Sequence, residues 1–232
     1  MVISMTYIPV VDNVDKVDGF HSGQLLFGVR QEVLDLFEDP KVLINTCSMN
    51  YVRKSADKAE ASAGNISSNS KELTIIGGTA STKDNSWVYW NLPTDASRVY
   101  TKVHMLVVSN GYTTIDYCDA DGSTYDNPPN TYLVWLQPQN ATKDFGMQKR
   151  LSGTNYDLGS EGIDLSANTY YLVEYYWDDS GKLKVWRDNV LKFDITDTAI
   201  SPIRSVRFRM RDNSTSEALK GKFKGPVIII YE

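Results

Sequence analysis

The most constraining feature of this chain is residues 170–194, YYLVEYYWDDSGKLKVWRDNVLKFD, where apolar and polar side chains alternate between turn signals. A period of two places successive side chains on opposite faces of a strand. The turns fall at Asp179-Ser180-Gly181 and at Asp188-Asn189, where Gly and Asn tolerate the positive φ of tight connections. The stretch predicts an antiparallel meander. Such a sheet displays side chains rather than enclosing a cofactor, which favours surface recognition.

Short strand-like segments separated by turn signals continue from residue 72 to the C-terminus. Asn110-Gly111, Asp121-Gly122 and Ser152-Gly153 mark turns, and no long helical pattern interrupts them. This spacing predicts an all-β fold, an antiparallel β-sandwich or jelly roll. No repeat of fixed period is present, which disfavours a propeller or solenoid. Besides the meander, the expected strands are 73–76, 87–92, 98–109, 113–118, 131–138, 145–150, 206–210 and 227–231.

Residues 1–45 differ in character from the rest. The segment 29–38, VRQEVLDLFE, places Val33, Leu36 and Phe37 at helical spacing and ends just before Pro40, so one short helix is predicted there. Residues 54–71 are small and polar, as in a surface loop or linker. We therefore expect a docking or oligomerisation segment over residues 1–45 and a sandwich domain over residues 46–232.

Composition disfavours several classes of protein. The chain has 232 residues, 41% of them hydrophobic, and a net charge of -5, which fits one large all-β domain and argues against bulk nucleic-acid binding. No apolar run approaches the ~20 residues of a membrane span, and the N-terminus lacks the pattern of a secretory signal. Cys47 and Cys118 are too few for a disulfide framework and have no companion His for zinc. Whether they pair stays open.

From residue 72 onward the chain resembles the concanavalin A-like jelly-roll sandwiches, a group that contains laminin G-like lectin domains and many glycan-active enzymes. The similar features are the strand LTIIGG at 73–78, the hairpin at 170–186 and the late strand GKFKGPVIII at 221–230. The likeness is one of pattern rather than of motif. It implies the fold more than any activity, with a glycan as the expected ligand.

A second, shorter resemblance lies in residues 15–23, DKVDGFHSG. This segment is similar to one that recurs in tail-fibre and other virion proteins of tailed viruses, although Val14 stands where that pattern often has Ala. The alternative is a solvated turn. The resemblance implies a virion surface protein, such as a capsid decoration, tail fibre or attachment component, that forms homo-oligomers, assembles with other virion proteins and binds host glycans.

The sequence lacks the catalytic arrangements of enzymes with this fold. Retaining glycoside hydrolases carry Glu-x-Asp-x-x-Glu on one strand, because the nucleophile and the acid must lie ~5 Å apart. Glu174, Asp178 and Asp179 do not supply such a pair, and His104 lacks the preceding glutamine of the lyases. We expect no enzymatic activity. A glycan-cleaving enzyme with a divergent site and a cellular carbohydrate-binding module are the alternatives.

A basic ladder is the first candidate for ligand binding. Its members alternate with apolar residues along one strand, so their guanidinium groups project from one face. With Lys182 and Lys184 on the same face, the ladder could hold an acidic glycan or a carboxylate-bearing partner. The alternative is an ordinary sheet face where arginines pair with Glu174 or Asp side chains. The ladder consists of Arg207, Arg209 and Arg211.

Two further candidate sites come from acidic and aromatic residues. Asp119, Asp121 and Asp126 surround a glycine turn, which predicts a calcium site, but the spacing falls short of an EF-hand and Pro128-Pro129 also fits a solvated loop. Sugars stack on aromatic rings, and the chain has fourteen Tyr and five Trp. Most of these rings belong to the core, and Trp87 and Trp90 face opposite sides of one strand. The candidates for glycan stacking are Tyr125, Tyr156 and Trp135, with Tyr132 and Trp177 as further possibilities.

Overall fold

A computed structural model describes residues 41–44, 52–55, 66–68, 72–76, 85–94, 96–107, 111–122, 129–138, 143–162, 165–211 and 220–231. Across these ranges the chain is all-β and contains no helix. The helix expected at 29–38 and the virion-like segment at 15–23 lie outside them. None of the described residues forms a helix that could cross a membrane.

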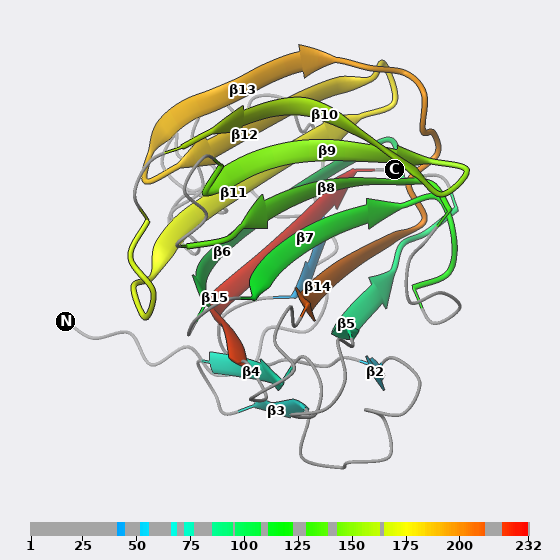
Figure 1. Cartoon of the computed structure of the whole chain (residues 1–232). Helices are drawn as coiled ribbons and strands as arrows, with labels where there is room; N and C mark the ends of the chain where they lie inside the picture. Colours follow the sequence, from blue (N-terminus) through cyan, green and yellow to red (C-terminus); the bar gives the residue numbers. More distant parts are fainter. Residues whose placement is uncertain are drawn as a thin grey trace, which may run out of the picture.

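The strands form two antiparallel sheets that pack face to face (Figure 1). One sheet has eight strands in the order β13-β12-β11-β6-β15-β4-β3, with β1 also paired to β15, and the other has seven in the order β10-β9-β8-β7-β14-β5-β2. The strands are β1 (Lys41–Ile44), β2 (Val52–Ser55), β3 (Ile66–Ser68), β4 (Glu72–Ile76), β5 (Asn85–Asn91), β6 (Arg98–Val107), β7 (Tyr112–Cys118), β8 (Thr131–Leu136), β9 (Phe145–Leu151), β10 (Thr154–Glu161), β11 (Tyr171–Asp178), β12 (Lys182–Arg187), β13 (Val190–Thr196), β14 (Ser205–Arg211) and β15 (Lys220–Tyr231).

The core lies between the two sheets and takes alternate residues from each strand. Trp177 of the eight-stranded sheet and Phe208 of the seven-stranded sheet are both fully buried there. Rings meet across the interface: Phe208 stacks on Phe223 at 5.0 Å between centroids, and Tyr117 stacks on Tyr175 at 4.1 Å. Each large apolar side chain buried in this way stabilises the fold by about 1.5–3 kcal/mol, so the alternating pattern itself holds the sheets together.

The predicted sandwich is confirmed, and so are the turns that carried the prediction. Gly181 has a φ of 83°, and Asp188 and Asn189 have φ values of 49° and 67°. Two successive residues with positive φ are the geometry of a tight two-residue hairpin. The sequence missed β10, whose residues are mostly polar and exposed, because this edge strand is held by its pairing with β9 rather than by an apolar face.

The division at residue 45 stays a prediction. β1 lies at the end of the segment assigned to the N-terminal part, and it pairs with β15, so Lys41 is opposite Ile230 in the eight-stranded sheet.

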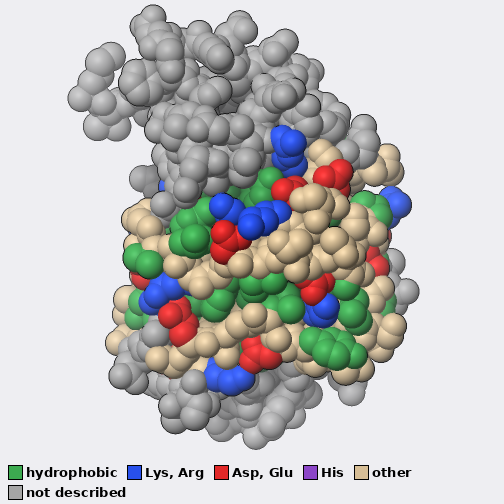
Figure 2. All heavy atoms as spheres, turned by 90° about the horizontal axis from the view of Figure 1, so that it is seen from above, with side chains coloured by type: hydrophobic (Ala, Val, Ile, Leu, Met, Phe, Trp, Pro, Cys, Tyr) green, Lys and Arg blue, Asp and Glu red, His purple; other side chains and the backbone are tan. Residues whose placement is uncertain are grey.

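The edge strands β10 and β13 meet along one side of the sandwich. Phe193 lies against Gly159, where an added Cβ would come within 2.8 Å of the ring. Glu161 pairs with Arg187 at 3.0 Å and with Lys192 at 3.2 Å. Figure 2 looks onto the molecule from this side and shows acidic and basic side chains next to each other, with hydrophobic ones between them. These contacts close the sandwich along this side.

Candidate functional site

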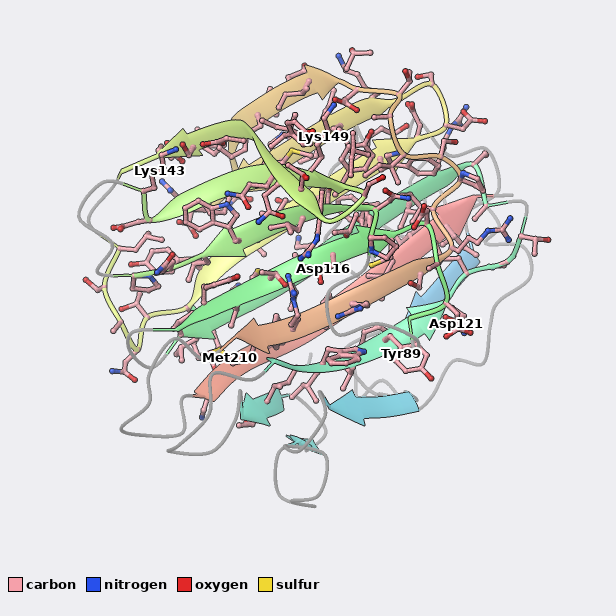
Figure 3. All side chains as sticks on the ribbon, turned by 45° about the vertical axis from the view of Figure 1, so that its right-hand side comes forward. Tyr89, Asp116, Asp121, Lys143, Lys149 and Met210 are labelled. Carbon is pink, nitrogen blue, oxygen red and sulfur yellow. The ribbon has the colours of Figure 1, made fainter. Side chains whose placement is uncertain are left out.

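The side of the seven-stranded sheet that points away from the core carries large and charged residues. On β14, Val206, Phe208 and Met210 enter the core, so Arg207 and Arg209 point outward. Register places Arg207 beside Asp116 of β7 and Arg209 beside Thr114, and Thr114 in turn faces Trp135 of β8. Asp116 lies in the middle of this sheet (Figure 3). We call the set Thr114, Asp116, Trp135, Arg207 and Arg209 the Asp116 face.

The two arginines of the Asp116 face converge on its carboxylate. Nε of Arg209 is 3.1 Å from Oδ2 of Asp116, and Nε of Arg207 is 3.8 Å from the same oxygen. Arg209 also donates from Nε to Oγ1 of Thr114 at 3.2 Å. Asp116 is fully buried and Arg207 is 1% exposed. The geometry therefore fixes both guanidinium groups against a buried aspartate.

The predicted ladder thus exists as a row on one face, but it is buried and paired with an aspartate instead of open to solvent. The condition under which Lys182 and Lys184 would join the ladder, a shared face, is not met, because β12 belongs to the other sheet, where both lysines pair with Asp194. Arg211 has the next outward register position on β14, and its side chain lies outside the described residues. A role of the arginines in ligand binding stays a prediction.

Trp135 lies against the backbone of β9, and a glycine makes room for it. A Cβ on Gly146 would lie 2.6 Å from Cζ2 of the indole and 2.8 Å from Cε2. Trp135 is 6% exposed, and its Nε1 has no hydrogen-bond acceptor among the residues that the structure describes. The Asp116 face therefore contains a buried indole N–H that no group of the described residues accepts.

Trp135, Thr114, Arg209 and Trp87 are paired side by side across four neighbouring strands and form one register row. Trp87, at the other end of this row, is held differently. Its Nε1 donates to the carbonyl of Gly122 at 2.8 Å, and Cζ of Arg207 lies 4.5 Å from its ring centroid. Gly122 packs on Tyr89, whose Cβ would be 2.5 Å from a Cβ at position 122. Trp87 is thus a structural residue that joins β5 to the loop after β7 and supports Arg207.

The predicted calcium ligands in that loop are held by amides instead. Oδ2 of Asp119 accepts a hydrogen bond from Asn130 at 2.7 Å, and Oδ2 of Asp121 accepts one from Asn91 at 2.9 Å. Figure 3 shows Asp121 near Tyr89 at the edge of the sheet. No group of three His, Cys, Asp or Glu side chains in the described ranges could hold a metal. Asp126 lies outside those ranges, so a site that includes it stays a prediction.

The other aromatic candidates do not join the Asp116 face. Tyr156 is 47% exposed on β10, and its register partner Lys149 is opposite the core residue Tyr132, so Tyr156 points to the other side of the sheet. Tyr132 and Trp177 are core residues. Tyr125 lies outside the described residues. The structure therefore brings together Trp135, Arg207 and Arg209 from the predicted glycan set.

Cys118 follows Asp116 along the same face of β7. It is a free, buried thiol, and burial raises its pKa to about 11 although Arg207 opposes the shift. At neutral pH it is a neutral thiol, whereas nucleophilic cysteines need a lowered pKa. Cys47 lies outside the described residues.

The Asp116 face has one carboxylate. In the register row of Asp116, the next is Asp157 on β10, three strands away, which is about 14 Å at the usual strand spacing. Glycosidases place their two carboxyl groups about 5–9.5 Å apart. Glu174 and His104 belong to the eight-stranded sheet, where Glu174 is buried and accepts a hydrogen bond from Tyr100. The face therefore brings buried aromatic and charged side chains together, and its register rows offer no hydrolytic pair among the described residues.

No protein-family model matches this sequence, and no curated protein is similar to it. Several solved structures share its architecture. A native glycosidic hydrolase matches with a TM-score of 0.59 and 11% identity, over 83% of this chain and 95% of its own. The β-glucanase of Bacillus licheniformis matches with a TM-score of 0.55 and 16% identity, over 82% and 98%. The exoplasmic/lumenal domain of VIP36, bound to Ca2+ and Man3GlcNAc, matches with a TM-score of 0.57 and 10% identity, over 81% and 86%.

The fold is a concanavalin A-like jelly roll. These likenesses show the fold that the sequence resemblance implied, at identities too low to assign an activity.

Sequence reasoning missed Asp116, Thr114 and Gly146. One signal was present: Asp116 lies inside YTTIDYC, an otherwise strand-like run. Asp is depleted from strands, and a charge there is rarely buried without a partner. An aspartate in the middle of a predicted strand therefore pointed to a paired, buried carboxylate.

Proposed function

We propose that this chain is a non-enzymatic glycan-binding domain that holds its ligand on the Asp116 face. The observation that carries the proposal is the meeting of Trp135, Asp116 and Arg209 on three neighbouring strands, outside the core. A sheet side that faces away from the core normally displays polar residues to solvent. Here an indole, a carboxylate and a guanidinium are buried on it.

The chemistry of this set suits a sugar. The apolar C–H face of a sugar ring packs on an indole, and its hydroxyl groups exchange hydrogen bonds with carboxylate and guanidinium groups. Ligand sites commonly combine apolar or aromatic walls with a few well-placed polar groups. The shared fold supports the proposal further, because the VIP36 domain of the same fold was solved with Man3GlcNAc bound.

We assign no catalytic step to the face, because no second carboxylate in the described register rows lies at the separation from Asp116 that glycoside hydrolysis needs. A glycan-cleaving enzyme is the rival, since a glycosidic hydrolase and a β-glucanase share the fold. Incubation of the purified chain with neutral and acidic polysaccharides separates the two. Release of new reducing ends would overturn the non-enzymatic assignment.

We further propose that glycan binding serves a virion surface protein, present as a homo-oligomer with other virion proteins and located on the particle. The support is the resemblance of residues 15–23 to tail-fibre and other virion proteins. Mass spectrometry of purified particles, with copy number from ordered density, tests this role. Absence of the chain from such particles would refute it and leave the binding site unaffected.

The binding face itself is tested with paired variants in a glycan-array and calorimetry experiment. Trp135→Ala removes the indole of the Asp116 face and should abolish binding. Tyr156→Ala removes an exposed ring on the other side of the same sheet and should leave binding unchanged. Lost binding in Tyr156→Ala together with unchanged binding in Trp135→Ala would place the ligand near the edge strand β10 and refute the assignment.

A further inference from the structure

We infer that the ligand is a neutral sugar, and that Nε1 of Trp135 and Oδ1 of Asp116 contact its hydroxyl groups directly. The inference rests on the proposed function and specifies which class of glycan the same face takes. It follows from two buried polar atoms that form no hydrogen bond with the described residues.

The first atom is a donor. Nε1 of Trp135 is buried and meets no acceptor in the described part of the chain. The contrast with Trp87 excludes a general shortage of acceptors on this side of the sheet, because the indole of Trp87 reaches the carbonyl of Gly122 at 2.8 Å. A buried N–H without a partner costs free energy. Native structures rarely keep one unless a ligand, an ion or a water completes it.

The second atom is an acceptor. Asp116 is fully buried, and neither of its carboxylate oxygens accepts a hydrogen bond within the described ranges. The closest approach of an arginine is Nε of Arg209 to Oδ2, at 3.1 Å. Oδ1 is therefore available to accept a hydrogen bond from a ligand. Ionised carboxylates form stronger hydrogen bonds than neutral acceptors.

The two atoms lie on adjacent strands and within reach of one ligand. Trp135 is directly opposite Thr114, and Asp116 is two residues further along β7. Diagonal neighbours of this kind have Cα atoms about 7–8 Å apart, a separation that side chains bridge. A hydroxyl group both donates and accepts, so a sugar with several hydroxyls can satisfy both atoms at once.

A neutral sugar fits this pair better than an acidic one. A ligand carboxylate has no proton to donate to Oδ1 of Asp116, and its charge would repel that of the aspartate. The sequence offered an acidic glycan or a carboxylate-bearing partner on the condition that Lys182 and Lys184 share the face of the arginines. The lysines belong to the other sheet, and Arg207 and Arg209 both lie against Asp116.

The test measures affinity by calorimetry for the full chain against neutral oligosaccharides and against uronic-acid and sialic-acid oligosaccharides of equal length. Trp135→Phe keeps an aromatic ring and removes the N–H. Trp177→Phe is its matched control, because Nε1 of Trp177 is also buried and meets no acceptor among the described residues, but lies in the core between the sheets. We expect binding of a neutral sugar, an affinity loss of about tenfold in Trp135→Phe and no change in Trp177→Phe.

Three outcomes would overturn the inference. Binding of acidic oligosaccharides alone refutes the ligand class and leaves the proposed glycan-binding function in place. Equal affinities of Trp135→Phe and Trp177→Phe for a neutral sugar show that a trapped water, rather than the ligand, satisfies the indole. Failure of every oligosaccharide to bind removes the proposed function and this inference with it. Melting curves of both variants show whether each one folds.

Discussion

Replacing Trp87 and Trp135 in turn by Phe compares two indoles that share one register row and differ in their hydrogen bonding. Trp87 donates to the carbonyl of Gly122 at 2.8 Å, whereas Trp135 donates to no acceptor in the described part of the chain. Both residues are buried. Both substitutions remove the same atoms and leave a similar cavity, so the cavity cost largely cancels in the comparison.

The main remaining difference is the hydrogen bond, because the phenyl ring of Trp87→Phe still offers an aromatic face to Arg207, whose Cζ lies 4.5 Å from the Trp87 ring centroid. Trp87→Phe leaves the Gly122 carbonyl without its donor, at a cost of about 1–3 kcal/mol. Trp135→Phe breaks no hydrogen bond and removes an unsatisfied donor. We therefore expect Trp87→Phe to be the less stable variant by about 2 kcal/mol, which corresponds to about 4–8 °C in Tm for a chain of this size.

Chemical denaturation followed by tryptophan fluorescence and circular dichroism measures both free energies of unfolding in the absence of sugar. Equal m-values are required for the comparison, because a changed m-value signals a change in the folded or unfolded ensemble. If Trp135→Phe loses as much stability as Trp87→Phe, the Trp135 indole is satisfied in the free protein. The reasoning about its unpaired N–H is then wrong.

Three further predictions concern the same face. Gly146→Ala should displace the Trp135 indole, because the added Cβ would lie 2.6 Å from it; we expect a loss of about 1–3 kcal/mol from overpacking together with lost sugar binding, and an unchanged near-ultraviolet spectrum would contradict this. Asp116→Ala should lower the free energy of unfolding by about 3–5 kcal/mol because Arg209 loses its buried partner. A loss of less than ~1 kcal/mol in urea denaturation would show that the pair contributes little. Burial raises the pKa of Cys118 from 9.0 to about 11, so the folded state binds this proton more tightly. Stability is full below pH ~9 and falls as pH rises towards 11, by up to about 3 kcal/mol. Cys118→Ala should flatten the decline between pH 9 and 10, and an unchanged slope in pH-dependent denaturation would assign the decline to other groups.

The local sequence pattern was sufficient to predict most strands of the sandwich and the side of the sheet to which their side chains point. Phe208 enters the core while its neighbours Arg207 and Arg209 point outward, as alternation predicted. The hairpin at Asp188-Asn189 adopts positive φ at both residues. Each of these features depends on residues adjacent in the chain, so it can be read without knowledge of the partner strands.

Sheet membership could not be read in this way. Alternation alone left open whether Lys182 on β12 shares a face with Arg209 on β14, and they belong to different sheets. The edge strand β10 was missed because its side chains are mostly polar and its formation depends on pairing with β9. Pairing between strands distant in the sequence is a property of the whole fold, and no local window contains it.

The sequence by itself determined a β-sandwich and selected Trp135, Arg207 and Arg209 as candidates for binding. Only the tertiary structure decided that β7 lies between β8 and β14, which places Asp116 next to all three residues. It also decided that Gly146 makes room for the indole and that the indole N–H is buried away from every acceptor in the described ranges. The physical reason is that burial and hydrogen-bond satisfaction depend on which groups the fold brings together in space, whereas alternation depends on the order of residues along one strand.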